Sequence, residues 1–447
     1  MSITLIEKDN GYKDGFSEFI KNFASADPDW LKSIREEGIS TFAELGFPTT
    51  RNEDWRFTNV APIARSAFEI SRNGYIEPSP EDLTKFMFEG STSAALVFIN
   101  GNYAQGLSRT ESLPQGVIVS SLTEALRDHG ELVRQHLAKY ADIKDEAFTA
   151  LNNAFFVDGG FIYIPSGTVL ENPVHLLYVS APTEKPGVAS PRNLIIAEEN
   201  AQANVVEQYV SLEESVYLSN VVTELVVGEN STLGHYLIEC ESKKSFNVST
   251  LRVEQGRNSN IRSHSVLLGG AIVRNNVHPV LAGEGCDSLI NGLFLPSGRQ
   301  HMDNYMKVEH VSPHSDSRQF YNGILDGHSR GVFHGRIIVH EDAQKTDAKQ
   351  TNRNLLLSDH AQIDTKPQLE IYADDVKCTH GATIGQIDED AIFYLRSRGI
   401  SQVASRDIIL NAFTNETLDS MNVESVKNYC SALVADWFSQ RKSENNK

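Results

Sequence analysis

The sequence predicts a mainly β protein built as a solenoid of short stacked strands, with helical segments at both ends. Between residues 151 and 380 the chain contains many short, β-branched, alternating stretches, such as FIYIPSGTVL, NVVEQYVS and GVFHGRIIVHE. Small polar turns separate these stretches, and no long helical pattern interrupts them. Asn200, Asn230 and Asn258 recur 30 and then 28 residues apart, which is a spacing typical of solenoid repeats.

A coil of stacked strands explains this pattern economically. Each turn of the coil buries one face inward and bonds its backbone to the next turn, so unpaired sheet edges remain only at the two ends. Those ends need covering, and helical segments on both sides of the β region are suited to it. An antiparallel sandwich or barrel is the competing architecture, because strand pattern alone does not separate the two.

The spacing of apolar residues divides the chain into three regions, 1–150, 151–380 and 381–447. The first region is mostly helical: FSEFIKNFA and DWLKSIREEGISTFAELG have helical spacing, while AALVFING and GVIVSS are expected to be short strands. The second region is the predicted β-solenoid core.

The third region returns to helical spacing. DEDAIFYLRSRG begins with acidic residues and ends at Gly399, as expected for the start and stop of a helix. The next helix places Ile408 and Phe413 on one face, and the last helix places Cys430 and Trp437 on another.

The composition excludes several classes of protein. The formal net charge is 40 − 59 = −19, and an acidic surface repels nucleic-acid phosphates. No apolar run approaches the roughly 18 residues that a membrane span needs, and the N-terminus lacks the pattern of a secretory signal. We therefore expect a cytoplasmic protein without nucleic-acid or membrane partners.

The four cysteines, Cys240, Cys286, Cys378 and Cys430, lie far apart in the chain. Without CxxC pairs they are expected to be free thiols, and a structural zinc site or a ferredoxin-type cluster is disfavoured. Cys240 and Cys430 are expected in the core. Cys286, in the turn GEGCDS, is expected to be more exposed and has no assigned role.

The sequence contains one enzyme motif and lacks two others, the phosphate loop and HExxH. No GxxxxGK[ST] phosphate loop is present, so a process that uses ATP would need a separate subunit. Residues 327–331 (GHSRG) match the GxSxG pattern of a nucleophile elbow, which needs a helix after the serine. The alternating residues that follow predict a strand, so a glycine-rich turn is the better interpretation.

Cys378 and His380, in the segment DVKCTHGATIG, are the strongest candidate pair for binding a metal ion or a sulfur species. At this spacing in an extended segment both side chains point the same way. A thiol and an imidazole on one face can bind iron or a sulfur species, and a charged imidazole would lower the pKa of the thiol. The alternative is a buried structural cysteine beside a capping histidine. His334 and His340, on one predicted strand, form a weaker candidate metal-binding pair.

Three segments resemble the SufB/SufD family of iron–sulfur cluster assembly proteins. CTHGATIGQIDEDAIFYLRSRGIS resembles the family's C-terminal signature, NAFFVDGGFIYIPSGTVLENPVHLLYVS the opening of its core, and RNEDWRFTNV its N-terminal motif. Together they span about residues 45 to 415. The chain resembles the D-type members, because His380-Gly381 stands where B-type members carry His-Glu and QTNRN lacks the cysteine of the B type.

The resemblance implies a right-handed parallel β-helix that acts as a non-catalytic scaffold for cluster assembly in the SUF system. It implies a heterodimer with a SufB-type paralogue and binding of a SufC-type ATPase through the C-terminal helices, and it leaves a homodimer of the isolated chain open. No cofactor would be held stably by the chain alone, whereas iron or an iron–sulfur cluster would be held transiently in the complex.

The resemblance also assigns residues to these contacts. His380 and Cys378 match positions near which the clusters form, at the interface with the paralogue. Arg396, Arg398 and Gly399, in the C-terminal signature, would lie near the ATPase.

Two other functions stay open. A β-helix carbohydrate lyase or hydrolase would use clustered carboxylates along one groove, but no strand here repeats acidic positions on one face. A purely structural subunit, which braces its paralogue without any cluster ligand, fits the sequence as well.

Overall fold

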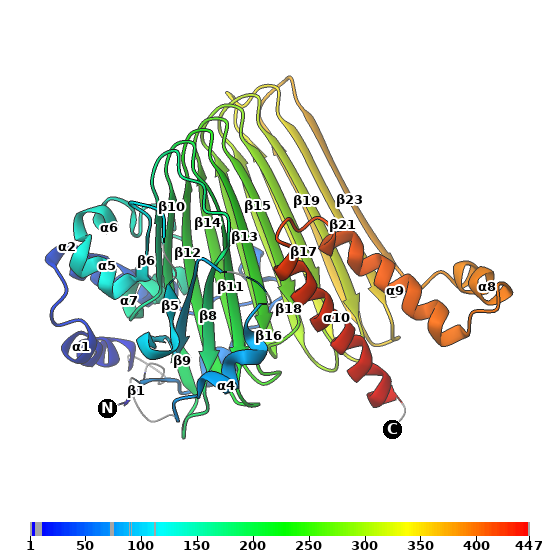
Figure 1. The fold of residues 1–447 in the computed structure, drawn as a ribbon, viewed down its shortest axis with the longest axis horizontal. Helices are drawn as coiled ribbons and strands as arrows, with labels where there is room; N and C mark the ends of the chain where they lie inside the picture. Colours follow the sequence, from blue (N-terminus) through cyan, green and yellow to red (C-terminus); the bar gives the residue numbers. More distant parts are fainter. Residues whose placement is uncertain are drawn as a thin grey trace.

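The computed structural model describes residues 2–4, 11–71, 76–88, 90, 92–110 and 113–445. It confirms the predicted β-solenoid flanked by helices: two long sheets run side by side through the molecule, with helices at the N-terminal end and across one outer face (Figure 1). The successive turns pair in parallel, which excludes the antiparallel sandwich.

The two sheets take alternate strands of the chain. The first contains β7 (Gly160–Ile164), β9 (Gly187–Ala189), β10 (Arg192–Ala197), β12 (Tyr217–Val227), β14 (Phe246–Gln255), β16 (Ile272–Leu281), β18 (His301–His310), β20 (Arg330–Val339) and β22 (Gln362–Ile371), joined by β1 (Ser2–Thr4), β2 (Glu69–Ser71) and β6 (Ile118–Ser121). The second contains β8 (Val174–Ser180), β11 (Gln202–Ser211), β13 (Thr232–Cys240), β15 (Asn260–Leu267), β17 (Asp287–Phe294), β19 (Asp316–Leu325), β21 (Asp347–Leu356) and β23 (Lys377–Gly385), joined by β3 (Ala94–Ile99), β4 (Asn102–Tyr103) and β5 (Arg109–Thr110).

Helices flank this core on both sides in the sequence. Before it come α1 (Gly11–Phe23), α2 (Asp29–Leu45), α3 (Ala61–Arg65), α4 (Pro80–Leu83), α5 (Leu122–Asp128), α6 (Gly130–His136) and α7 (Ala147–Phe155), with 3₁₀ turns at Glu53–Trp55, Thr84–Phe86 and Gln105–Leu107. After it come α8 (Glu389–Ser397), α9 (Gln402–Leu418) and α10 (Glu424–Asn445). None of the helices in the described ranges is long and apolar enough to cross a membrane.

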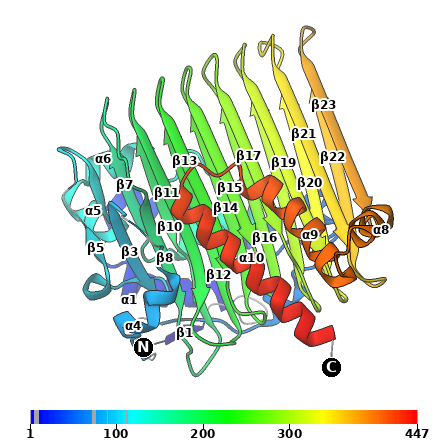
Figure 2. The same ribbon diagram turned by 45° about the vertical axis from the view of Figure 1, so that its right-hand side comes forward.

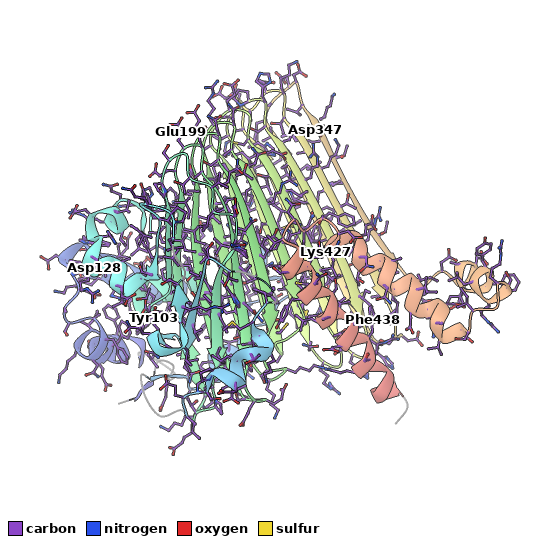
Figure 3. The ribbon with its side chains drawn as sticks, viewed as in Figure 1. Tyr103, Asp128, Glu199, Asp347, Lys427 and Phe438 are labelled. Atoms are coloured by element: carbon purple, nitrogen blue, oxygen red, sulfur yellow. The ribbon has the colours of Figure 1, made fainter. Side chains whose placement is uncertain are left out.

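The recurring asparagines form one corner of the solenoid. Asn200, Asn230 and Asn258 have positive φ angles of 59°, 56° and 53°, a conformation that asparagine tolerates better than most residues. Each backbone N–H donates to a carbonyl of the next turn, as from Asn230 to Arg257 at 2.9 Å. Glu199, next to the first of these corners, is labelled in Figure 3.

The two ends of the solenoid differ. At the N-terminal end, the residues around β4 and β6 pack onto the interior, so that Tyr103, Val117 and Val119 close it. At the C-terminal end, β22 and β23 are the last strands of their sheets, and side chains along β23 are largely exposed. Figure 2 shows β22 and β23 at this end, with α8 projecting beyond them and α9 and α10 crossing the second sheet.

The C-terminal helices pack on the outer face of the second sheet. Val426 and Cys430 of α10 are buried against it, as the spacing predicts. In α9, Leu410 and Leu418 are buried and Ile409 and Phe413 pack beside them, whereas Ile408, expected on the same face as Phe413, is 46% exposed. The apolar spacing of α9 covers more than one face, so spacing alone did not identify the packed one.

Candidate functional site

The candidate pair, Cys378 and His380, lies on β23 at the open end of the solenoid. Parallel register stacks equivalent residues of the second sheet into columns that run along its length. The His380 column runs through Val205, His235, Ser263, Ile290, Gln319 and Gln350. The Cys378 column runs through Ala203, Leu233, Ile261, Ser288, Ser317 and Ala348. Both columns contain interior core residues, so the two side chains share the inward face at the mouth of the interior, as the i, i+2 spacing predicts.

Burial dominates the environment of the Cys378 thiol. Cys378 is half-buried and packs against the apolar interior. Burial and the nearby Asp347 carboxylate raise the pKa of the Cys378 thiol, although a backbone hydrogen bond from Ala348 opposes them. The groups that shift this pKa do not include the exposed His380, so a lowering of the thiol pKa by a charged His380 stays a prediction.

Two ligands do not make a complete metal site. Among the residues that the structure describes, no group of three or more His, Cys, Asp or Glu side chains is placed to hold a metal ion. An iron–sulfur cluster is usually held by four protein ligands. Cys378 and His380 alone therefore fall short of the ligand number that such a site needs.

One feature of this site was missed by the sequence reasoning. Gln319 and Gln350 lie directly below His380 in its column, and Nε2 of Gln350 donates to Oε1 of Gln319 at 2.7 Å. The signal was present, because Gln319, Gln350 and His380 are separated by 31 and 30 residues, which is one turn of the solenoid each. Spacing alone does not fix the register between turns, so the sequence does not show that these three residues share one column.

The signature residues Arg396, Arg398 and Gly399 lie at the end of α8. Arg396 and Arg398 are exposed, and Arg398 donates to the hydroxyl of Tyr394 at 3.1 Å. Gly399 ends the helix with a φ of 87°, as the sequence predicts. Beside them, Phe393 is 72% exposed, and α8 and α9 together form an arm with apolar and basic side chains on its surface.

The other cysteines are structural. Cys430 is fully buried, as expected, and Cys240 is half-buried against α10. The expectation that Cys286 is more exposed is wrong, because its side chain is only 1% exposed. Cys286 follows a corner residue and points inward, where Sγ lies 3.1 Å from the carbonyl oxygens of Gly256 and Gly283.

The remaining motifs do not assemble into sites. His334 is buried and pairs with Gln368 at 2.6 Å, whereas His340 is exposed and lies 3.3 Å from Glu309. Within the described ranges neither joins a group of ligands that could hold a metal. Strand β20 begins at Arg330, directly after the serine of the GxSxG match, so no nucleophile elbow forms there.

Two family descriptions match almost the whole chain. Residues 6–176 match the "SufBD protein N-terminal region", and residues 179–413 match "SUF system FeS cluster assembly, SufBD core domain". The second description covers most of the β-solenoid and part of the C-terminal helices. The chain belongs to the SufBD family.

Within the family, the relatives confirm the predicted likeness to SufD. The chain is 32% identical to the iron–sulfur cluster assembly protein SufD of Escherichia coli over 402 residues, which cover 89% of this chain and 91% of that one. It is 33% identical over 405 residues to a SufBD family protein of Synechocystis, covering 89% of each. It is 26% identical over 434 residues to SufD of Bacillus subtilis, covering 93% and 96%.

Proposed function

We propose that this chain is a non-catalytic scaffold subunit for iron–sulfur cluster assembly. It pairs with a SufB-type paralogue through the open end of its solenoid, engages a SufC-type ATPase through the α8–α9 arm, and helps to build the nascent cluster between the two solenoids. The observation that carries the proposal is the open end, where two sheet edges, a thiol and an imidazole are presented together.

The open end has the features of a docking surface. The edges of β22 and β23 are the ends of their sheets, and such edges readily pair with another chain. Tyr372 is 64% exposed, and Ile371 and Ile384 are also exposed. A second solenoid placed end to end would continue both sheets and cover these apolar side chains, whether it is a paralogue or a second copy of this chain.

The cluster is cargo in this proposal and not a resident cofactor. His380 would offer iron a neutral imidazole nitrogen, or carry a proton, at the mouth of the interior. Since this chain supplies two candidate ligands, the paralogue would supply the remaining thiolates or carboxylates. Burial and the Asp347 carboxylate raise the pKa of Cys378, and a metal ion or a positive group on the partner would favour its thiolate.

The exposed arm is suited to an ATPase partner. The chain has no phosphate loop of its own, so nucleotide would bind on another subunit. Exposed Phe393 and Tyr394, flanked by Arg396 and Arg398, give the arm an apolar surface with a basic rim. ATP-driven closure would act on the interface between the solenoids only if the ATP-bound state favours one arrangement of the two solenoids over the other.

The test uses the complex reconstituted from this chain, a SufB-type paralogue and a SufC-type ATPase. His380→Ala should lower cluster build-up, followed by its visible absorption, by about tenfold or more while the complex still assembles. His328→Ala is the matched control, because His328 is also exposed but lies on a solenoid corner. Unchanged build-up in His380→Ala and in the double variant with Cys378→Ser would reject the ligand role and favour a subunit that only braces its paralogue.

A further inference from the structure

Gln350, which lies next to His380 in its column, has a side-chain carbonyl oxygen that accepts no hydrogen bond within the described residues. Gln319 and Gln350 are 2% and 1% exposed, and they are joined by the hydrogen bond from Nε2 of Gln350 to Oε1 of Gln319. In the described part of the chain, Oε1 of Gln350 has no hydrogen-bond partner. A buried carbonyl oxygen without a donor is costly, and such groups are rare in folded proteins.

The position of the Gln350 amide is fixed from the opposite sheet. A Cβ atom added at Gly335 of β20 would lie 2.1 Å from Nε2 of Gln350, so the amide lies against the backbone there and glycine leaves the room it needs. With its nitrogen bonded to the turn below and its side packed on β20, the amide has its oxygen left for a donor in the turn above. The residue in register above it is His380.

We propose that Gln350 is the positioning residue for His380. One ring N–H of His380 donates to Oε1 of Gln350 when the imidazole lies over the mouth of the interior. The other ring nitrogen is then unprotonated and directed outward. This inference rests on the proposed function, because the outward nitrogen is the one that would meet iron at the interface.

The chemistry and the spacing both support this role. Histidines that bind metals commonly donate their second ring N–H to a carbonyl or carboxylate, which fixes the tautomer and the ring orientation. Adjacent strands lie about 4.8 Å apart, so side chains stacked in one column are within reach of each other. Cys378 has no such support, since Ala348 lies below it. The inference is therefore specific to His380.

The first test reads the tautomer directly in the full-length chain. Nitrogen chemical shifts of ¹⁵N-labelled histidine, with the His380 signals assigned through His380→Ala, distinguish the two neutral tautomers at alkaline pH, where free imidazoles are uncharged. We expect one dominant tautomer in the wild type, a mixture in Gln350→Met, and one dominant tautomer again in Gln350→Glu, which keeps an acceptor oxygen.

The matched control is Asn354→Leu. Asn354 lies on the same strand, faces the same interior and is equally buried, but it belongs to the column of Ile384. Asn354→Leu should leave the His380 tautomer unchanged. Gly335→Ala, which displaces the Gln350 amide without removing it, should produce the same mixture as Gln350→Met and guards against a folding defect in that variant.

The second test reads iron in the reconstituted complex. Gln350→Met should weaken iron retention by about 10- to 100-fold, and Gln350→Glu should restore it. A wild-type tautomer in Gln350→Met would overturn the inference, even if His380→Ala abolishes cluster build-up and so upholds the proposed function. A mixed tautomer in Gln350→Met together with full cluster build-up in His380→Ala would uphold the positioning contact and reject the ligand role.

Discussion

The two ends of the solenoid differ in whether the chain itself covers the interior and the last strands of the two sheets. At the N-terminal end, the chain closes the interior with its own residues and locks the first turns with buried polar contacts. Arg192 and Glu224 form an ion pair with both side chains fully buried, and Glu224 also accepts from the backbone N–H groups of Ala138, Tyr140 and Ala141. At the C-terminal end, β22 and β23 are the last strands of their sheets and the side chains along β23 are exposed. The difference indicates that one end is complete in the single chain and the other is completed by a partner.

The largest expected effect is at the closed end. Arg192→Met leaves the Glu224 carboxylate buried without its cation, which should lower the free energy of unfolding by about 3–5 kcal/mol in denaturant titrations. Arg353→Met, which breaks the exposed pair with Glu416, should cost less than about 1 kcal/mol. Equal losses in the two variants would contradict the view that buried contacts lock this end.

The pH dependence of stability should come from buried carboxyls away from the open end. Burial and the charge of Glu241 raise the pKa of Glu239 to about 8, and burial raises the pKa of Glu241 to about 7. These folded values lie above those of an unfolded chain, near 4.5, so the folded state holds the extra protons. Their contribution to stability should therefore fall as the pH rises from about 4.5 to about 8, whereas buried histidines with a lowered pKa, such as His264, contribute in the opposite direction.

The variant Glu239→Gln tests this sign. Relative to Glu239→Gln, the free energy of unfolding of the wild type should drop across that window by on the order of 2–5 kcal/mol. Glu416→Gln, at an exposed position, should keep the wild-type slope. A wild-type slope in Glu239→Gln would show that the buried pair does not govern the response.

The open end should affect association and leave folding unchanged. Tyr372→Ala should weaken binding to the SufB-type paralogue by about 1–2 kcal/mol in a titration, because exposed aromatic residues are common interface anchors. Its effect on unfolding of the isolated chain should stay within about 0.5 kcal/mol. Phe393→Ala on the arm is the reciprocal control, since it should weaken the ATPase contact and spare the paralogue. Loss of both contacts in either variant would mean that the two surfaces are not separate.

The smallest effect is expected at the corners, which are shared by both ends. Asn230→Ala should lower the free energy of unfolding by about 1 kcal/mol, because alanine does not favour the positive φ of 56°. Asn230→Gly should change it by only a few tenths of a kcal/mol. If alanine and glycine behave alike at this position, the backbone conformation is not what asparagine provides.

The sequence predicted what depends on local pattern. Alternation gave the strands, the asparagine spacing gave the repeat, and the i, i+2 spacing put Cys378 and His380 on one face. It did not reveal what depends on register between turns: the inward position of Cys286, the Gln350 amide beneath His380, and the exposed face of α9 around Ile408. The raised pKa of Cys378 has the same origin, because it comes mainly from burial by residues that are distant in the sequence.

Hydrogen exchange of this chain, alone and in the complex with the SufB-type paralogue, tests most directly whether the open end is the partner-binding end. Backbone amides of β22 and β23 should exchange quickly in the isolated monomer and become protected on complex formation, while amides of β7, β10 and α7 should change little. Protection at the N-terminal end, with the exchange of β23 unchanged, would contradict the account.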